Sequence, residues 1–365
     1  DRLGGSWAPA PDEHPAAFGL SERNHGDDLL SAWFGPFLEV LRRGRAPAAA
    51  LGLLLWGADA RGQEDSTDDE GREDESSVEI VVMGDDRTPR VAGSAHVLDE
   101  EDLELFAQDD IHQVLARVPG VYVRQEDGFG LRPNIGIRGA SSERSSKLTL
   151  LEDGVPVAPA PYAAPAAYYF PMVTRMAAVE VFKGPAAVQT GPQTVGGAIN
   201  MVTRSVPRDG TVASVDLAAG LRNTGRVHAY VGHGDERSGV LGEFTMLTTT
   251  GFKELDGGGP TGFRRGEGMV KARVASDPAL RVQHALEVKV GYAGELSNET
   301  YLGLSVTDLD TPYRRYASTA LDQMGWHRTQ LEVSWPVRLG PDLKIRTTAY
   351  HHELDRAWVK VNRFA

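Results

Sequence analysis

Cysteine is absent from all 365 residues of the chain. A cytosolic enzyme of this length usually carries a few thiols, whereas free thiols are a liability in an oxidising compartment. Positive charge is also scarce, because 38 Lys and Arg stand against 51 Asp and Glu, for a formal net charge of -13. Nucleic-acid binding needs clustered Lys and Arg. The composition therefore favours the cell envelope and argues against a nucleic-acid partner.

Long apolar runs and catalytic motifs are missing too. No stretch of about 18 apolar residues exists, so no transmembrane helix is predicted. HExxH, GxSxG and Walker motifs are absent, and residues 128–130 (GFG) lack the third glycine of a dinucleotide fingerprint. His351 and His352 are adjacent, so in a strand they would point to opposite faces and could not share a metal. We expect no enzymatic activity, no metal site and no cofactor.

The N-terminal part has the pattern of a secreted protein. Arg42, Arg43 and Arg45 precede an apolar run at residues 46–56, and Ala58 and Ala60 give a small-x-small cleavage pattern. Residues 40–60 are therefore predicted to be a signal peptide, with a short buried helix as the alternative. Since Met83 is the first methionine, we expect residues 1–39 to be upstream sequence translated in error.

Two short segments follow. Residues 61–77 include eight carboxylates between positions 64 and 75 and are predicted to be a solvated acidic tether. Residues 78–83 (VEIVVM) form a β-prone stretch between polar flanks. From the residues alone, this stretch is either a strand that adds to the sheet edge of a partner or the first strand of the next domain.

Residues 99–204 have the pattern of a compact α/β unit. Asp110 is predicted to cap a helix with Gln113 at the reciprocal position, and an apolar face follows at Ile111, Val114, Leu115 and Val118. Strands are predicted at residues 121–123, 135–137, 148–151, 155–157 and 179–182. Asp153 and Gly154 form the hairpin signal between the third and fourth of these.

After Gly210 the pattern changes to strict alternation. Leu286, Val288 and Val290, for example, alternate with Glu287 and Lys289, and similar segments predict about seven strands. Short turns are predicted at residues 234–238, 276–280 and 336–342, and long connections at about 249–266 and 293–325. Short turns at one end and long loops at the other are typical of an outer-membrane barrel, although soluble antiparallel sheets also alternate.

Five motifs resemble those of one family. They are VPGV at 118–121, IGIRG at 135–139, LEDGVPV at 151–157, VEVFKGP at 179–185 and GGAINMVT at 196–203. Their order and spacing resemble the plug of TonB-dependent outer-membrane receptors, over about residues 78–210. The resemblance implies an α+β plug domain followed by antiparallel transmembrane β-barrel strands. About seven of about twenty-two strands would be present, which is an incomplete barrel.

The resemblance also implies a division of the chain and its partners. Residues 78–84 would be the TonB box, 85–210 the plug domain and 211–365 the truncated N-terminal part of the barrel. The box would bind a TonB-type protein of the inner membrane, with plug and tether facing the periplasm and the barrel in outer-membrane lipid. The complete receptor would be a monomer. The TonB-binding residues are Val78, Glu79, Ile80, Val81, Val82 and Met83.

Residues 153–171 resemble the ferric citrate branch most. The expected function is energised uptake of a ferric chelate, either ferric citrate or a siderophore, by a chain that would not transport alone. The alternatives are a receptor for cobalamin or another metal chelate, a soluble or surface β-rich binding protein with a plug-like adaptor, and a passive porin.

Anionic chelates need Arg and polar donors. The candidate ligand residues are Arg124, Gln125, Arg132, Tyr162, Tyr168, Tyr169, Asn298, Tyr301, Arg314 and Arg315. Each is also compatible with an ordinary loop residue. Arg138 is instead predicted to pair inside the plug with a carboxylate such as Glu180.

Overall fold

A computed structural model describes residues 93–157, 169–191, 194–300, 302–340 and 343–361. The predicted extension at 1–39, signal peptide at 40–60, tether at 61–77 and TonB box at 78–84 lie outside the described residues. The same holds for Tyr162, Tyr168 and Tyr301. These assignments and the domain boundaries built on them stay predictions.

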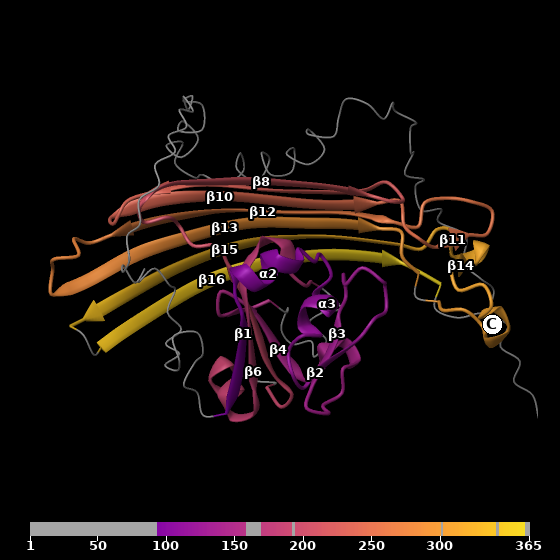
Figure 1. Ribbon diagram of the computed structural model, residues 1–365, viewed down its shortest axis with the longest axis horizontal. Coiled ribbons are helices and arrows are strands. Elements are labelled where there is room, and N and C mark those ends of the chain that lie inside the picture. The colour runs from indigo at the N-terminus through magenta and orange to yellow at the C-terminus, as the bar shows by residue number, and fades with distance from the viewer. Residues whose placement is uncertain (1–92, 158–168, 192–193, 301, 341–342, 362–365) are drawn as a thin grey trace, which may run out of the picture. The chain divides into compact units, whose positions relative to one another are not determined.

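The first part of the described chain is an α+β unit. Its five-stranded sheet has the order β1-β6-β7-β4-β5, and only β4 and β7 pair in parallel. The strands are β1 (Ser94–Leu98), β4 (Leu148–Glu152), β5 (Val155–Pro156), β6 (Met176–Lys183) and β7 (Gly197–Thr203). The helices α2 (Glu100–Phe106) and α3 (Ile111–Leu115) and the hairpin of β2 (Val121–Arg124) and β3 (Asn134–Ile137) complete it (Figure 1).

Helix α3 begins as predicted. The Asp110 carboxylate accepts a hydrogen bond from the backbone N–H of His112 at 2.8 Å, one residue before the predicted capping position at Gln113. The predicted apolar face is confirmed, because its four members are all buried: Ile111, Val114, Leu115 and Val118.

The predicted hairpin at Asp153 and Gly154 is also confirmed. Both residues have positive φ, 51° and 82°, which is the conformation of the tight turn that matches strand twist. The Asp153 carboxylate turns back and accepts hydrogen bonds from the backbone N–H and the hydroxyl of Thr203, at 2.8 and 2.6 Å. The tip of the hairpin is thereby attached to the end of β7.

The second part is a seven-stranded antiparallel sheet, as predicted, whose strands follow one another in chain order. Its members are β8 (Gly210–Gly220), β9 (Thr224–Gly234), β10 (Ser238–Thr249), β12 (Phe263–Ala275), β13 (Val282–Ser297), β15 (Gln323–Leu339) and β16 (Leu343–Val359). Within the described residues the sheet is open, with β8 and β16 at its edges. A two-residue parallel pair joins β11 (Glu254–Leu255) to β14 (Arg314–Arg315) in the loops.

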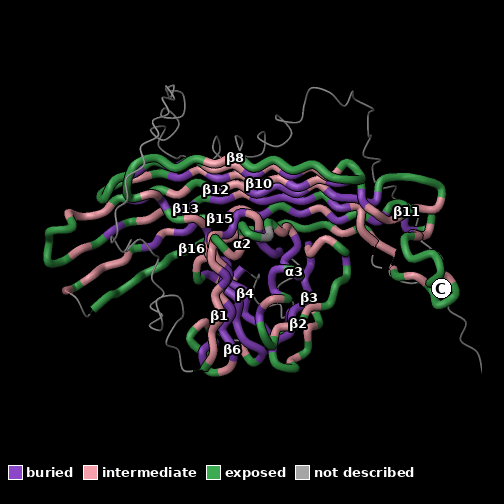
Figure 2. Tube along the Cα trace, viewed as in Figure 1, coloured by how far each residue is buried: buried purple, intermediate pink, exposed green. Residues whose placement is uncertain are grey.

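Burial on this sheet is the reverse of that in a soluble protein. Arg265 and Lys289 are 2% and 4% exposed, whereas Val290 and Leu331 are 41% and 44% exposed. Figure 2 shows buried and exposed positions alternating along the central strands. A soluble sandwich would cover the apolar face with a second sheet, but here the polar face is the covered one. An apolar face left bare is what a barrel presents to lipid.

The connections confirm most of the predicted asymmetry. At one end, called the turn end, the strands are joined by residues 235–237, 276–281 and 340–342. At the opposite loop end, the connections are 250–262, 298–322 and a short one at 221–223. The last turn begins later than predicted, because β15 continues through Pro336, which pairs with Arg346 of β16. Among the described residues, no helix is long and apolar enough to cross a membrane.

The bare apolar face predicts a depth-dependent cost of charge. Val290 lies in the middle of β13, and Leu339 ends β15 on the same face. Val290→Arg is expected to lower the free energy of unfolding in lipid vesicles by about 2–4 kcal/mol, against about 0–1 for Leu339→Arg. Urea titrations followed by tryptophan fluorescence measure both. Equal costs at the two positions would show that lipid does not contact this face.

Candidate functional site

The α+β unit lies against one face of the seven-stranded sheet (Figure 1), and buried charged side chains make part of the contact beside apolar ones. These charges come from strands far apart in sequence. Burying them is costly unless each one finds a partner. The partners therefore show how the unit is held.

Arg175 is the centre of the contact. It is the last residue of a short 3-10 turn before β6, and its guanidinium lies 2.8 Å from the Glu152 carboxylate of the same unit and 2.5 Å from Glu267 of β12. Lys289 of β13 reaches the other side of Glu152 at 2.6 Å. Burial by itself would raise the pKa of Glu152, but Arg175 and Lys289 outweigh it and hold that pKa well below its usual range. Glu152 is therefore a permanent anion that joins the two parts.

Tyr169 completes this centre. Its hydroxyl accepts a hydrogen bond from Arg175 at 3.1 Å and donates one to Glu267 at 3.3 Å. Its ring meets Trp326 edge to face at 5.4 Å, and the guanidinium of Arg328 lies 4.4 Å from the ring centroid. Burial raises the pKa of Tyr169, so the hydroxyl stays protonated. Tyr169 therefore serves the interface, and its predicted contact with a ligand stays a prediction.

A second contact lies toward the loop end. Arg132 is buried and pairs with Glu295 of β13 at 2.5 Å and with Glu299 just beyond that strand. Asp127 shapes the loop by accepting the backbone N–H groups of Phe129 and Arg132 at 2.6 and 2.9 Å. The loop is thereby fastened to the sheet at the base of the long connections.

Glu299 is an unusual member of this contact. Burial raises its pKa to about 7, in spite of the opposing charge of Arg132, and the nearby carboxylates of Asp127 and Glu295 raise it further. The group therefore changes charge near neutral pH.

A pocket opens beside this contact. The ring of Phe129 lies 5.4 Å from Phe252 and 5.0 Å from Phe263, centroid to centroid. These three rings line the pocket together with Asp127, Leu131, Lys253, Thr261, Ser297, Asn298 and Glu299. Sequence reasoning found Asn298 but missed the aromatic residues, Lys253 and Glu299. Aromatic residues next to glycines in loops, as in GFG at 128–130 and GF at 251–252, were the available signal.

The remaining candidates are spread out. Arg124 and Gln125 are exposed on the α+β unit. Arg314 lies 3.0 Å from both Asp256 and Asp308, so its charge is shared between two loop aspartates. Arg315 is buried and donates to Thr319 and to loop carbonyl groups, including that of Asp322 at 3.2 Å. Its surroundings are those of a loop-holding residue, and the ligand roles of all four stay predictions.

The predicted pairing of Arg138 with Glu180 is wrong. Arg138 is exposed, on a turn with φ of 52°, and the Glu180 carboxylate accepts a hydrogen bond from the Asn200 amide at 2.8 Å. Arg175, like Arg132, is buried and paired instead. The sequence did not show the pairing of Arg175, because its partner Glu267 lies 92 residues away on another sheet.

Loss of Arg175 is expected to weaken the attachment of the α+β unit. Arg175→Gln leaves Glu152 and Glu267 without their main counter-charge, which costs about 3–5 kcal/mol. Arg124→Gln, an exposed arginine of the same unit, is expected to stay within about 0.5 kcal/mol of wild type. Urea unfolding in detergent micelles measures both variants. Similar stabilities of the two variants would show that the Arg175 centre does not hold the unit.

Glu299 predicts a pH dependence. Its folded pKa is raised, so it favours the folded state below its unfolded pKa, and this contribution is lost as pH rises through about 7. Between pH 5 and pH 8, wild-type stability is expected to fall by about 1–3 kcal/mol more than that of Glu299→Gln. Urea unfolding at both pH values, with Glu104→Gln on exposed α2 as control, provides the measurement. A pH slope unchanged in Glu299→Gln would contradict the assignment.

Comparison with known proteins agrees with this arrangement. Residues 88–198 match the family model described as TonB-dependent Receptor Plug Domain. The chain is 32% identical over 126 residues to the vitamin B12 transporter BtuB of Vibrio vulnificus, covering 34% of this chain and 20% of that protein. It is 27% identical over 151 residues to BtuB of Photobacterium profundum, covering 40% and 24%. The match thus spans about a fifth to a quarter of these relatives.

Two solved structures have the same fold. Unliganded ferric citrate transporter FecA has a TM-score of 0.59 at 24% identity, over 73% of this chain and 40% of that one. The ferric yersiniabactin uptake receptor FyuA from Yersinia pestis has a TM-score of 0.55 at 18% identity, over 74% and 43%. The plug-domain match and the seven antiparallel strands with a bare apolar face lead to one conclusion. Residues 88–198 form a plug domain of the TonB-dependent receptor type, and the seven antiparallel strands that follow share the fold of the barrel strands in the two solved structures.

Proposed function

We propose that this receptor takes up a ferric chelate, either ferric citrate or a siderophore, with energy delivered by a TonB-type protein that binds residues 78–83. The outer membrane has no nucleotide pool, so energy has to arrive mechanically from the inner membrane. A β-prone segment next to an acidic tether is suited to binding the protein that delivers this energy. Strand addition needs main-chain hydrogen bonds and little side-chain chemistry.

One observation supports movement of the plug above the others. Its contact with the barrel strands includes ion pairs and hydrogen bonds around Arg175 and Arg132, and apolar side chains such as Met172 and Phe263 also pack across it. A buried ion pair contributes little net stability, because desolvation offsets most of the attraction. Water and a passing ligand can replace such contacts in turn. The plug can therefore shift as one body while its own core stays intact.

The ligand end of the plug has the chemistry for an anionic chelate. Arg124 and Gln125 are exposed on the plug, and Lys253 and Asn298 border the aromatic pocket. Charge-assisted hydrogen bonds from such groups suit carboxylate or similar donors around a metal. FecA and FyuA, which share the fold, are named for ferric ligands.

Cobalamin is the second candidate. The curated relatives that the chain matches over 126–151 residues are vitamin B12 transporters, at 27–32% identity. The match covers 20–24% of those proteins, so this likeness supports the receptor class more than the ligand. Uptake of radiolabelled ferric citrate and of radiolabelled cobalamin, measured side by side, separates the two.

The test is uptake by cells that lack their own iron receptors and express a complete receptor containing this chain. Ile80→Pro removes a backbone donor from the predicted TonB-binding strand and should reduce uptake to background while ligand binding persists. Ile80→Val keeps the backbone donor and should transport normally. Ferric citrate uptake that is unaffected by Ile80→Pro would contradict the proposed energy coupling, and uptake of cobalamin alone would contradict the proposed ligand.

A further inference from the structure

Two lysines face each other on the polar face of the barrel sheet. Lys271 of β12 and Lys289 of β13 are direct partners in the strand register, and both side chains are largely buried. Directly opposite side chains start about 4.5–5.5 Å apart at Cβ, and like charges there destabilise the pair. Such a pair needs an anion between its members.

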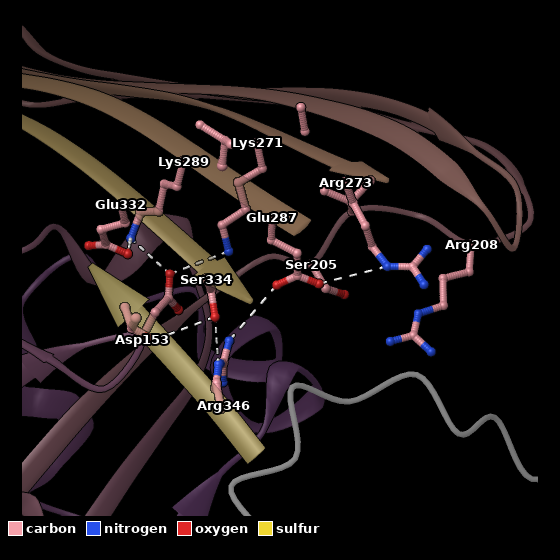
Figure 3. Close-up of a pocket in the computed structure, with 14 residues that line it drawn as sticks. Asp153, Ser205, Arg208, Lys271, Arg273, Glu287, Lys289, Glu332, Ser334 and Arg346 are labelled. Atoms are coloured by element: carbon pink, nitrogen blue, oxygen red, sulfur yellow. Dashed lines mark hydrogen bonds and ion pairs between the residues drawn. The ribbon is translucent and has the colours of Figure 1, made fainter. Parts of the chain in front are cut away.

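Asp153 of the plug supplies that anion. A single oxygen, Oδ2, lies 3.3 Å from the Lys271 ammonium and 2.8 Å from that of Lys289, and Figure 3 shows both lysines converging on it. Lys289 has further carboxylates at Glu152 and Glu332, at 2.6 and 3.6 Å. Lys271 depends more on Asp153, since its other hydrogen bond is a 3.5 Å contact to a plug carbonyl.

Most of the compensating charge thus belongs to the plug, while Glu332 of the barrel lies 3.6 Å from Lys289. Asp153 is held at the tip of the β4–β5 hairpin and tied to Thr203 at the end of β7. It must move with the plug. Any displacement of the plug that the proposed function requires takes Asp153 away and leaves two adjacent cations on the barrel wall.

More positive charge lies beside this pair. The pocket in Figure 3 also contains Arg273 of β12 and Arg346 of β16. Both share one carboxylate, Glu287, at 3.8 and 3.9 Å, near the limit of an ion pair. Arg273 Nε is buried and makes no hydrogen bond. The charged barrel residues of the pocket are four cations, Lys271, Arg273, Lys289 and Arg346, against two carboxylates, Glu287 and Glu332.

The pocket lies between the centre of the sheet and its turn end. Arg273 is two residues from the end of β12, and Arg346 is three residues into β16. The aromatic pocket with Phe129 and Phe252 lies at the loop end instead. A ligand that passes along the barrel wall from the loop end would meet the lysines after it has left that pocket.

We propose that Lys271 and Lys289, together with Arg273 and Arg346, form a transit site for a polycarboxylate ligand on the barrel wall. Asp153 occupies this site while the plug is seated, and its carboxylate marks where a ligand carboxylate binds once the plug has shifted. The inference rests on the proposed function for plug movement and for an anionic ligand. Replacement of the Asp153 carboxylate by a ligand carboxylate lets the ligand advance while the lysine charges stay compensated.

The test uses the full chain in detergent micelles and citrate as the probe, with binding measured by isothermal titration calorimetry. Asp153→Asn removes the resident anion and is expected to tighten citrate binding at least about tenfold over wild type. Adding Lys271→Gln to Asp153→Asn should return binding to the wild-type level. Adding Arg338→Gln, a β15 cation outside the pocket, should change nothing. Equal citrate binding by Asp153→Asn with and without Lys271→Gln overturns the proposal.

A folding defect in Asp153→Asn is also informative. If its near-ultraviolet circular dichroism differs from wild type, citrate should restore the native spectrum, whereas sodium chloride at equal ionic strength should not. If citrate does not restore the native spectrum, or if chloride restores it equally well, the proposed carboxylate site is contradicted.

These outcomes separate the two proposals. Citrate binding to purified protein requires neither a TonB-type partner nor transport. If cells take up iron but citrate binding does not depend on Lys271, the transit site is refuted and the proposed function stands. Binding that depends on Lys271, in cells that take up no ferric chelate, refutes the proposed function and leaves an anion site.

Discussion

Charge buried between the plug and the barrel strands is the constraint on which the rest of this structure depends. Arg175 bridges Glu152 and Glu267, and Asp153 bridges two lysines that would otherwise repel each other. Each part of the chain is incomplete without the other, because each buries charges whose partners lie across the interface. An apolar interface of similar area would be harder to separate. Exposing apolar surface to water costs free energy, and no hydrogen bond to water offsets that cost.

This constraint also explains the two faces of the sheet. Inward positions such as Lys289 and Glu332 are buried by the plug, whereas outward positions such as Val290 and Leu331 remain bare. A sheet with its apolar side exposed is stable only where lipid replaces water. The alternation of residues therefore gives the sheet an apolar face that contacts lipid and a polar face that contacts the plug.

Local features were predictable because their causes are local. The cap at Asp110, the turn at Asp153 and Gly154 and the alternation along β13 each depend on residues a few positions apart. Turn boundaries were less accurate, because Pro336 remains in β15 by pairing with β16. The turn predicted at residues 336–342 placed the end of that strand too early. Arg138 was assigned a buried role that belongs to Arg175, since both are plug arginines and only packing distinguishes them.

The sequence by itself determined the plug motifs, the number of strands and which face of each strand is apolar, since these follow from short-range patterns. Only the tertiary structure decided which charges meet. Glu267 reaches Arg175, Glu299 reaches Arg132, and Lys271 and Lys289 share Asp153, over separations of 92, 167 and more than 100 residues. The physical reason is that an ion pair depends on distance in space, and chain closure over such lengths leaves no trace in local composition.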